Sequence, residues 1–223
     1  ITTIKNELKL LNTFTATSEL AFGLMLNIQR KIIKASKSAS NGYWAREFYA
    51  GTQLYDKTLG ILGLGRLGSI SAKIGKGFGM KILATDIKSK KISGVKMVDI
   101  KNLFKKSDII TIHIHLNNKT KNLINKNLLK LMKPHSILIN TSRGGIINEK
   151  HLLEALKSKN IAGAGLDIVV GEWLDQNKLK NHKLVSYSKK NSNLLIVPHI
   201  GGSTYESITG ARRFVCNKIL KSL

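Results

Sequence analysis

A short glycine-containing segment that directly follows an apolar run constrains this 223-residue chain more than any other feature. The apolar run is 59–62, and the sequence GLGRLG at residues 63–68 follows it without a gap. Gly63 permits a tight turn, Gly65 lets another group approach the backbone closely, and Gly68 allows a helix to pack against the preceding strand. The segment therefore predicts a strand that turns sharply into a helix.

From Lys57 onward, the chain alternates short apolar runs with helical patterns. Strands are predicted at 59–62, 81–85, 109–114, 137–140, 162–166 and 194–197, and helices at 66–78, 100–106, 125–132, 149–159 and 204–220. This alternation is typical of an α/β, doubly wound parallel sheet, so we predict a Rossmann-type domain with flanking helices. Before this domain, residues 15–34 are predicted to form a helix that is apolar on more than one face, and hence buried or part of an oligomer interface. A connector is predicted to follow, through Tyr55.

The glycine segment in this context predicts a dinucleotide site. The helix N-terminus offers free N–H groups and a partial positive charge to phosphates. The next predicted strand ends at Asp86, 18 residues after Gly68, where a carboxylate can accept hydrogen bonds from a ribose and would repel a 2′-phosphate. The preferred cofactor is therefore NAD rather than NADP, although Lys88, Lys90 and Lys91 lie close by and soften that preference.

Polar residues follow three of the predicted strands, and we expect them to meet, because ligands bind beyond the carboxyl ends of parallel strands. They are Arg143, Glu172 and His199. Arg can hold a carboxylate bidentately, and His can exchange a proton near neutral pH. A neighbouring carboxylate would orient the His and favour its protonated form. Each residue alone has an ordinary structural explanation, but their joint placement after the glycine segment predicts a catalytic site.

The other histidines divide into two groups. His113 and His115 flank the end of an apolar strand and are expected to line the same cleft. His135, His151 and His182 are expected at the surface.

The composition limits the partners of the chain. Lys+Arg number 37 against 13 Asp+Glu, a net charge of +24, but only six are Arg and the Lys residues are scattered. Aromatic residues make up only 6% of the chain, so few are available to stack on bases. The composition therefore favours a solvated, lysine-rich surface, which can steer small anions, rather than a nucleic-acid binding surface. The single Cys216 fits a reducing compartment, here the cytoplasm, and excludes a multi-cysteine metal site. We expect no metal site, and no run is apolar enough to span a membrane.

Four segments together resemble the D-isomer-specific 2-hydroxyacid dehydrogenases. They are 59–68, 140–145 with Asn148-Glu149 after it, 163–167 and 198–204. The last, PHIGGST, is most similar to the D-3-phosphoglycerate dehydrogenase branch. The resemblance follows the family's order over most of residues 13–220.

The resemblance implies hydride transfer between NAD and C2 of a small, anionic D-2-hydroxy or 2-keto acid. In this family Arg143 would hold the substrate carboxylate and polarise the C2 oxygen, and His199 would be the acid/base with Glu172 as its partner. Asp167 would contact the nicotinamide carboxamide, and Arg66 and Leu67 would contact the pyrophosphate. The residues that line the cofactor cleft would be Ile114, Thr141, Ser142 and Gly201. PHIGGST favours a phosphorylated three-carbon acid such as 3-phosphoglycerate, while glyoxylate, hydroxypyruvate and a sugar-derived acid stay open.

The resemblance also implies how the chain is organised. Residues 1–55 would be a remnant of the substrate domain plus a linking helix that forms a homodimer, 56–201 the NAD-binding domain, and 202–223 a helix that returns towards the substrate domain. The substrate domain would be largely missing, so the fragment would bind cofactor but turn over poorly or not at all alone. Two positions depart from the family pattern. The family usually has Pro at the position of His115, and Trp173 lies where family members commonly have an acidic residue followed by Pro.

Two other functions stay open at this point. Some relatives of the family are co-repressors, so the chain could be a non-catalytic NAD(H)-sensing module, although a sensor would not need Arg143, Glu172 and His199. Formate dehydrogenase is disfavoured, because that branch pairs its His with an amide rather than with a carboxylate such as Glu172.

Overall fold

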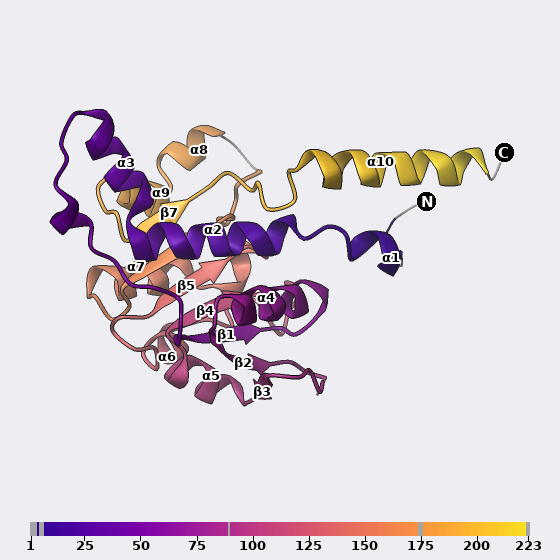
Figure 1. The fold of residues 1–223 in the computed structure, drawn as a ribbon, viewed down its shortest axis with the longest axis horizontal. Coiled ribbons are helices and arrows are strands. Elements are labelled where there is room, and N and C mark those ends of the chain that lie inside the picture. Colours follow the sequence, from indigo (N-terminus) through magenta and orange to yellow (C-terminus); the bar gives the residue numbers. More distant parts are fainter. Residues whose placement is uncertain (1–3, 5–6, 89, 174–175, 222–223) are drawn as a thin grey trace.

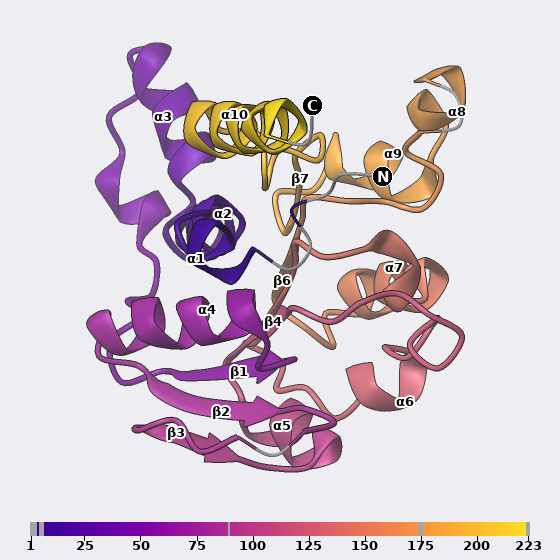
Figure 2. The ribbon, with the colours of Figure 1, turned by 90° about the vertical axis from the view of Figure 1, so that its right-hand side faces the viewer.

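Seven parallel strands form one sheet at the centre of the molecule (Figures 1 and 2). The computed structural model describes residues 4, 7–88, 90–173 and 176–221. The strands lie in the order β3-β2-β1-β4-β5-β6-β7. They are β1 Thr58–Leu62, β2 Lys81–Thr85, β3 Val95–Met97, β4 Ile109–Ile112, β5 Ile137–Asn140, β6 Gly163–Leu166 and β7 Leu194–Ile196. The strand order reverses between β1 and β4, and this confirms the predicted doubly wound parallel sheet.

The central strands are mostly apolar because helices cover both faces of the sheet. Every residue of β4, β5 and β6 is buried. Along β4, Ile109 joins the core on one face and Ile110 the core on the other. β3 was not predicted, because its three residues, VKM, carry too little pattern and lie at the edge of the sheet. β4 also ends two residues before the predicted end at 114.

Two helical layers enclose the sheet (Figure 2). On one face lie α2 (Ala16–Arg30) and α4 (Arg66–Gly77), whose core includes Met25 and Leu59. The opposite layer consists of α5 (Ile100–Lys106), α6 (Lys126–Leu129), α7 (Glu149–Lys157) and α9 (Lys183–Ser188). Each fully buried Leu or Ile contributes about 2 kcal/mol relative to an exposed one, so these layers hold the strand ends firmly in place.

The predicted helix at 15–34 is in fact two helices. α2 ends at Arg30, Lys31 adopts a left-handed φ of 54°, and α3 (Ile32–Ser40) leaves in a new direction. The Asn27 side chain accepts a hydrogen bond from the Ile33 amide and stabilises this corner. The apolar pattern continues into α3, but Ile32 and Ile33 are about half exposed. The buried character of α2 is confirmed, whereas the single continuous helix was wrong.

The segments between the main elements also contain helices that were not predicted. The expected connector before Tyr55 includes α3 and the short η1 (Arg46–Tyr49). α8 (Gln176–Lys180) and α9 follow β6. The predicted helix at 125–132 is shorter than expected, since only α6 is helical.

The first and last helices extend away from the sheet on one side (Figure 1). They are α1 (Leu8–Leu11) and α10 (Tyr205–Leu220), and an ion pair between Glu7 and Lys218 at 3.0 Å links their segments. α10 confirms the predicted tail helix, yet none of its residues is buried. None of the helices in the described part of the chain has the length and apolarity to cross a bilayer.

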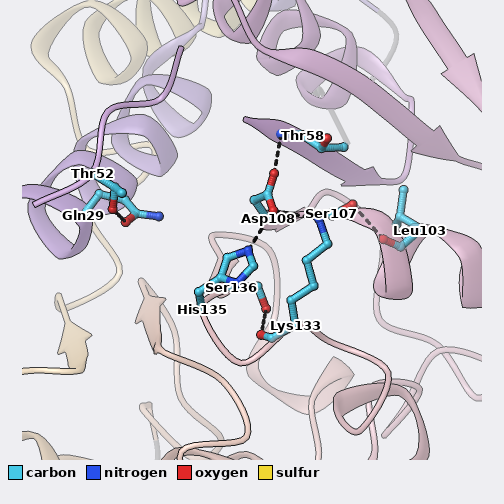
Figure 3. Close-up of polar contacts among 9 residues, drawn as sticks. All are labelled: Gln29, Thr52, Thr58, Leu103, Ser107, Asp108, Lys133, His135 and Ser136. Atoms are coloured by element: carbon cyan, nitrogen blue, oxygen red, sulfur yellow. Dashed lines mark hydrogen bonds and ion pairs between the residues drawn. The ribbon is translucent and has the colours of Figure 1, made fainter. Parts of the chain in front are cut away.

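A cluster of polar groups closes the amino end of the sheet (Figure 3). Asp108, just before β4, accepts hydrogen bonds from the Thr58 amide at 2.8 Å, Lys133 Nζ at 2.7 Å and His135 Nε2 at 3.0 Å. Burial alone would raise the pKa of Asp108, but the hydrogen bonds from Lys133, Thr58 and His135 outweigh it and lower the pKa to about 2. This carboxylate therefore ties β1, β4 and the turn before β5 together.

Candidate active site

A cleft of about 580 Å³ lies at the carboxyl end of the sheet. It collects eight of the predicted site residues: Leu67, Ile114, Thr141, Ser142, Arg143, Asp167, His199 and Gly201. His113 and His115 line it as well, as expected. Loops that are distant in sequence therefore meet at one edge, because the parallel strands all end there.

The glycine turn between β1 and α4 has the predicted form. Gly63 has a φ of 95°, and a Cβ there would come within 2.6 Å of the His113 carbonyl oxygen. A Cβ on Gly68 would lie 2.0 Å from the Gly63 carbonyl oxygen. Gly65, in contrast, has open space where its side chain would be, and as N-cap of α4 it leaves the helix start without a side-chain cap. Contacts within the chain thus explain why positions 63 and 68 need glycine, but they do not explain the glycine at position 65.

His199 and Glu172 form a close pair beside the cleft. His199 Nδ1 lies 2.6 Å from Glu172 Oε1, and both side chains are mostly buried. The Trp173 ring covers the imidazole, with ring centroids 5.4 Å apart. The other ring nitrogen, Nε2, has no hydrogen-bond partner among the described residues. One nitrogen is thus bound by a carboxylate, and the other is free to exchange a proton with a ligand.

Asp167 positions the loop that carries His199. Its buried carboxylate accepts hydrogen bonds from the amides of Ile200 at 2.7 Å and Gly201 at 2.8 Å, and its carbonyl accepts one from the His199 amide. These three bonds hold His199 at a left-handed φ of 53°, a conformation that costs energy for a residue with a side chain. Both carboxylate oxygens of Asp167 are therefore already engaged by the loop.

The loop after β5 carries Arg143 and is stabilised by the buried Asn140. The Asn140 side chain accepts hydrogen bonds from the Ser142 amide and hydroxyl and donates one to the Arg143 carbonyl oxygen. The Arg143 guanidinium is exposed and donates to the Ser142 carbonyl oxygen at 2.6 Å. It lies in the wall of the cleft that also contains His199, so a cation and a proton donor face the same space.

Comparison with known proteins decides the family. Residues 22–201 match the model of the family described as D-isomer specific 2-hydroxyacid dehydrogenase, NAD binding domain. The chain belongs to this family. The resemblance inferred from the four sequence segments is thereby confirmed.

Members of the dehydrogenase family with assigned names are similar over most of this chain. A D-3-phosphoglycerate dehydrogenase of Synechocystis sp. is 40% identical over 196 residues, which is 86% of this chain and 34% of that protein. A glyoxylate reductase of Thermococcus litoralis is 38% identical over 216 residues, 92% of this chain and 62% of that protein. The structure of a D-lactate dehydrogenase from Aquifex aeolicus with NAD and lactic acid has a TM-score of 0.83 at 28% identity, covering 93% of this chain and 65% of that one. The chain thus spans less than two thirds of each of these relatives.

The residues at the carboxyl edge fit the NAD of the family. Gly65 leaves open space at the start of α4, where a pyrophosphate can approach backbone N–H groups. Within the cleft, the Thr141 hydroxyl and His113 Nδ1 are buried and have no hydrogen-bond partner among the residues that the structure describes. Buried polar atoms are rarely left unpaired, so these two are suited to a polar ligand in the cleft.

Asp86 lies at the end of β2 beside the glycine turn. It accepts hydrogen bonds from the Leu64 amide at 2.6 Å and the Lys88 amide at 3.0 Å. Lys90 Nζ donates to the Leu64 carbonyl oxygen at 3.0 Å. A carboxylate and an ammonium group therefore both bind the backbone of Leu64 in the turn.

The Arg66 side chain is bound within the chain. Its guanidinium donates to the carbonyl oxygens of Leu11 at 2.5 Å and Phe14 at 2.8 Å. Burial lowers its pKa from the usual value, although an arginine stays charged. In this structure the side chain holds the segment before α2, and only the backbone of Arg66 belongs to the helix start.

His113 is a buried, neutral imidazole. Its Nε2 lies 3.0 Å from the Ser71 hydroxyl and 3.1 Å from the Thr111 hydroxyl. Burial lowers its pKa to about 4, so it carries no charge at neutral pH. It joins the end of β4 to α4 directly behind the glycine turn, and it offers no charge to compete with His199.

Three residues near the site were missed or misplaced by the sequence. Asn140 was noticed only as the end of a strand and the start of a family segment, although a polar residue that ends the apolar run ILIN is a signal for a structured turn. Glu149 was noticed only as part of a family segment. His182 was expected at the surface, and this was wrong, because its side chain is 17% exposed and its Nε2 lies 3.0 Å from Glu149 Oε2. No local pattern pairs residues 33 positions apart.

Proposed function

We propose that this chain carries the cofactor site and the acid/base group of an NAD-dependent D-2-hydroxyacid dehydrogenase. The observation that supports this most is the His199–Glu172 pair at 2.6 Å, placed beside a cleft that also contains Arg143. A protein that only senses NAD(H) has no use for a paired imidazole next to a guanidinium. A carboxylate partner for the imidazole likewise disfavours formate oxidation.

In the proposed reaction, each of the three residues has a separate task. Arg143 binds the carboxylate of the 2-keto acid and polarises its C2 oxygen. His199, protonated on Nε2, gives this proton to the C2 oxygen in the reduction direction and takes it back in the oxidation direction. Glu172 holds Nδ1, orients the ring and stabilises the imidazolium. The bound NAD(H) supplies or accepts the hydride at C2.

The proposed substrate is a small anionic 2-keto or 2-hydroxy acid. The +24 net charge favours anion steering, and the PHIGGST segment favours a phosphorylated three-carbon acid. Relatives named glyoxylate reductase and D-3-phosphoglycerate dehydrogenase are similarly close in identity, at 38% and 40%. We therefore propose 3-phosphohydroxypyruvate and glyoxylate as the first compounds to test.

The proposed organisation follows the predicted divisions at 55 and 201. α10 has no buried residue and stands beside α1 away from the sheet, as expected of a helix that packs on a further domain (Figure 1). Between 32 and 48, large apolar side chains are exposed: Ile32, Ile33, Tyr43, Trp44 and Phe48. This surface supports the proposed homodimer. The lone Cys216 supports a cytoplasmic location, and the scattered lysines support the absence of a specific nucleic-acid partner.

The proposal is tested by cofactor titration and by turnover. NADH and NADPH are titrated into the chain while ligand fluorescence is followed, and circular dichroism confirms the fold. Reduction of glyoxylate, hydroxypyruvate and 3-phosphohydroxypyruvate is then measured on a longer protein that contains this chain and a substrate domain. We expect saturable binding, tighter for NADH. His199→Ala is expected to lower kcat by about 100-fold or more, because general acid–base catalysis contributes 10²–10⁴-fold.

The control for this experiment is NADH affinity, which should stay within about 2-fold in His199→Ala. Saturable NADH binding by the longer protein without turnover of any keto acid would favour the sensing module. Turnover that His199→Ala leaves unchanged would remove His199 from the proposed role. A folded chain that binds neither nucleotide would contradict the cofactor site itself.

A further inference from the structure

Glu149, at the start of α7 just after the Arg143 loop, joins that part of the chain to the loop that carries Glu172. We propose that it is a positioning residue, which holds the segment leading to Glu172 against the loop of Arg143 and so keeps Glu172 on His199; this inference rests on the proposed function. Glu149 does not touch the cleft or the reacting groups. It acts through the backbone at Val170.

Each carboxylate oxygen of Glu149 has a hydrogen-bond partner. It lies in the first turn of α7, six residues after Arg143. Oε1 accepts a hydrogen bond from the Val170 amide at 2.8 Å, two residues before Glu172, and Oε2 lies 3.0 Å from His182 Nε2. Three separate segments, the start of α7, the loop after β6 and the start of α9, therefore meet on one side chain.

The same two loops touch at a second point. A Cβ on Gly144 would lie 2.7 Å from the Val169 carbonyl carbon and 2.8 Å from the Val170 amide nitrogen. The backbones can pass only because residue 144 has no side chain. Gly144 thus permits the close approach, and Glu149 provides the bond that keeps it.

Glu149 has no capping task that would explain its position. The preceding Asn148 already caps α7, since its side chain accepts a hydrogen bond from the His151 amide at 3.1 Å. The Glu149 side chain is only 20% exposed, and burial raises its pKa despite the bonds from Val170 and His182. In the first turn of α7 the carboxylate also interacts favourably with the helix dipole, but this benefit needs neither its burial nor its two partners, which are best explained by what Glu149 holds.

Loss of this bond is expected to reach Glu172 through a flexible position. Gly171 separates Val170 from Glu172 and has a φ of 81°. Without the bond at Val170, the segment can rotate at Gly171, and the contact of 2.6 Å between Glu172 and His199 would loosen. A misplacement of about 1 Å in such a site costs up to about 100-fold in rate.

The test compares four single variants. Glu149→Ala and Glu149→Met remove the acceptor, and Met keeps the volume of the side chain should the alanine variant fail to fold. Glu149→Gln keeps an acceptor oxygen for Val170. Glu154→Ala, an exposed carboxylate on the same helix, is the matched control. The first readout is the NMR resonance of the Nδ1 proton of His199, assigned by its loss in His199→Ala; the second is kcat for keto-acid reduction together with KM for NADH.

We expect Glu149→Ala and Glu149→Met to shift or broaden the Nδ1 proton resonance and to lower kcat about 10-fold, with KM for NADH within about 2-fold. Glu149→Gln should recover most of the wild-type resonance and most of kcat. Glu154→Ala should match the wild type in both readouts. A folded Glu149→Met with an unchanged resonance overturns the positioning role, and so does an equal loss in Glu149→Gln. If no keto acid were turned over, the proposed function would fail, while the resonance would still decide the role of Glu149.

Discussion

At the amino end of the sheet, Asp108 accepts three hydrogen bonds from groups of this chain, and its pKa falls to about 2 (Figure 3). At the carboxyl end, the Thr141 hydroxyl and His113 Nδ1 are buried without partners in the described part of the chain, and His199 is held at a φ of 53°. Both ends belong to the same strands, because β4 starts next to Asp108 and ends next to His113.

The difference shows how one sheet separates stability from function. Polar groups at the amino end are satisfied internally, so they stabilise the fold. Those at the carboxyl end are partly unsatisfied or strained, and such features persist only where the surrounding structure enforces them. The well-packed layers around the sheet hold that strain in place for a ligand.

Asp108→Asn is expected to give the largest change in stability. The amide can still accept a hydrogen bond from Thr58, but the charged bond to Lys133 is weakened, and charged hydrogen bonds contribute about 2 kcal/mol each. Chemical denaturation should show a loss of about 2 kcal/mol at pH 7. NADH affinity should be unchanged, because Asp108 lies at the opposite end of the strands. A loss of NADH affinity larger than the loss of stability would break the comparison.

The same variant predicts a pH dependence. Because the pKa of Asp108 is lower in the folded chain than its usual 3.8, the folded state binds this proton less tightly than the unfolded state. The stabilisation is fully present above about pH 4 and is lost as the pH falls towards 2. As the pH falls from about 4 to about 2, the unfolding free energies of wild type and Asp108→Asn should therefore converge. Curves that stay parallel would contradict the lowered pKa.

The sequence was most informative where both faces of a strand are buried. The runs that became β1, β2 and β5 are continuous or alternating apolar segments bounded by turn residues, and their bounds were predicted within one residue. β3 and α9 were missed because short amphipathic elements at the rim owe their structure to packing rather than to pattern. The corner at Lys31 was missed because the apolar pattern continues through it.

The predicted site residues gather at one edge because the topology alone brings them there. The sequence did not reveal what holds them in place. Asp167 was predicted to contact the cofactor, but no sequence pattern indicated that its carboxylate oxygens also hold the His199 loop. Glu149 and His182 lie 33 residues apart and meet only through the packing of α7 and α9. Hydrogen bonds between loops depend on three-dimensional neighbours, which no local pattern records.

Asp86→Asn makes the same chemical change at the other end of the sheet, with an opposite expectation. The amide still accepts the hydrogen bond from the Leu64 amide, so the unfolding free energy should change by less than about 0.5 kcal/mol. The loss of charge weakens bonds to the ribose and removes repulsion of a 2′-phosphate, while Lys90 stays nearby. The ratio of NADPH to NADH affinity should rise about 10-fold in fluorescence titrations. An unchanged ratio would exclude Asp86 as the group that selects NAD.

Thr141→Val tests whether the carboxyl edge gives up stability for ligand binding. The hydroxyl is buried and unpaired, so an isosteric apolar side chain should stabilise the free chain by about 1 kcal/mol and weaken NADH binding by a few-fold. The matched control is Thr111→Val, because the Thr111 hydroxyl is equally buried but lies 3.1 Å from His113 Nε2. This control should lose about 1 kcal/mol. Denaturation and NADH titration of both variants measure the contrast, and two variants with the same sign of stability change would show that Thr141 is no less satisfied than Thr111.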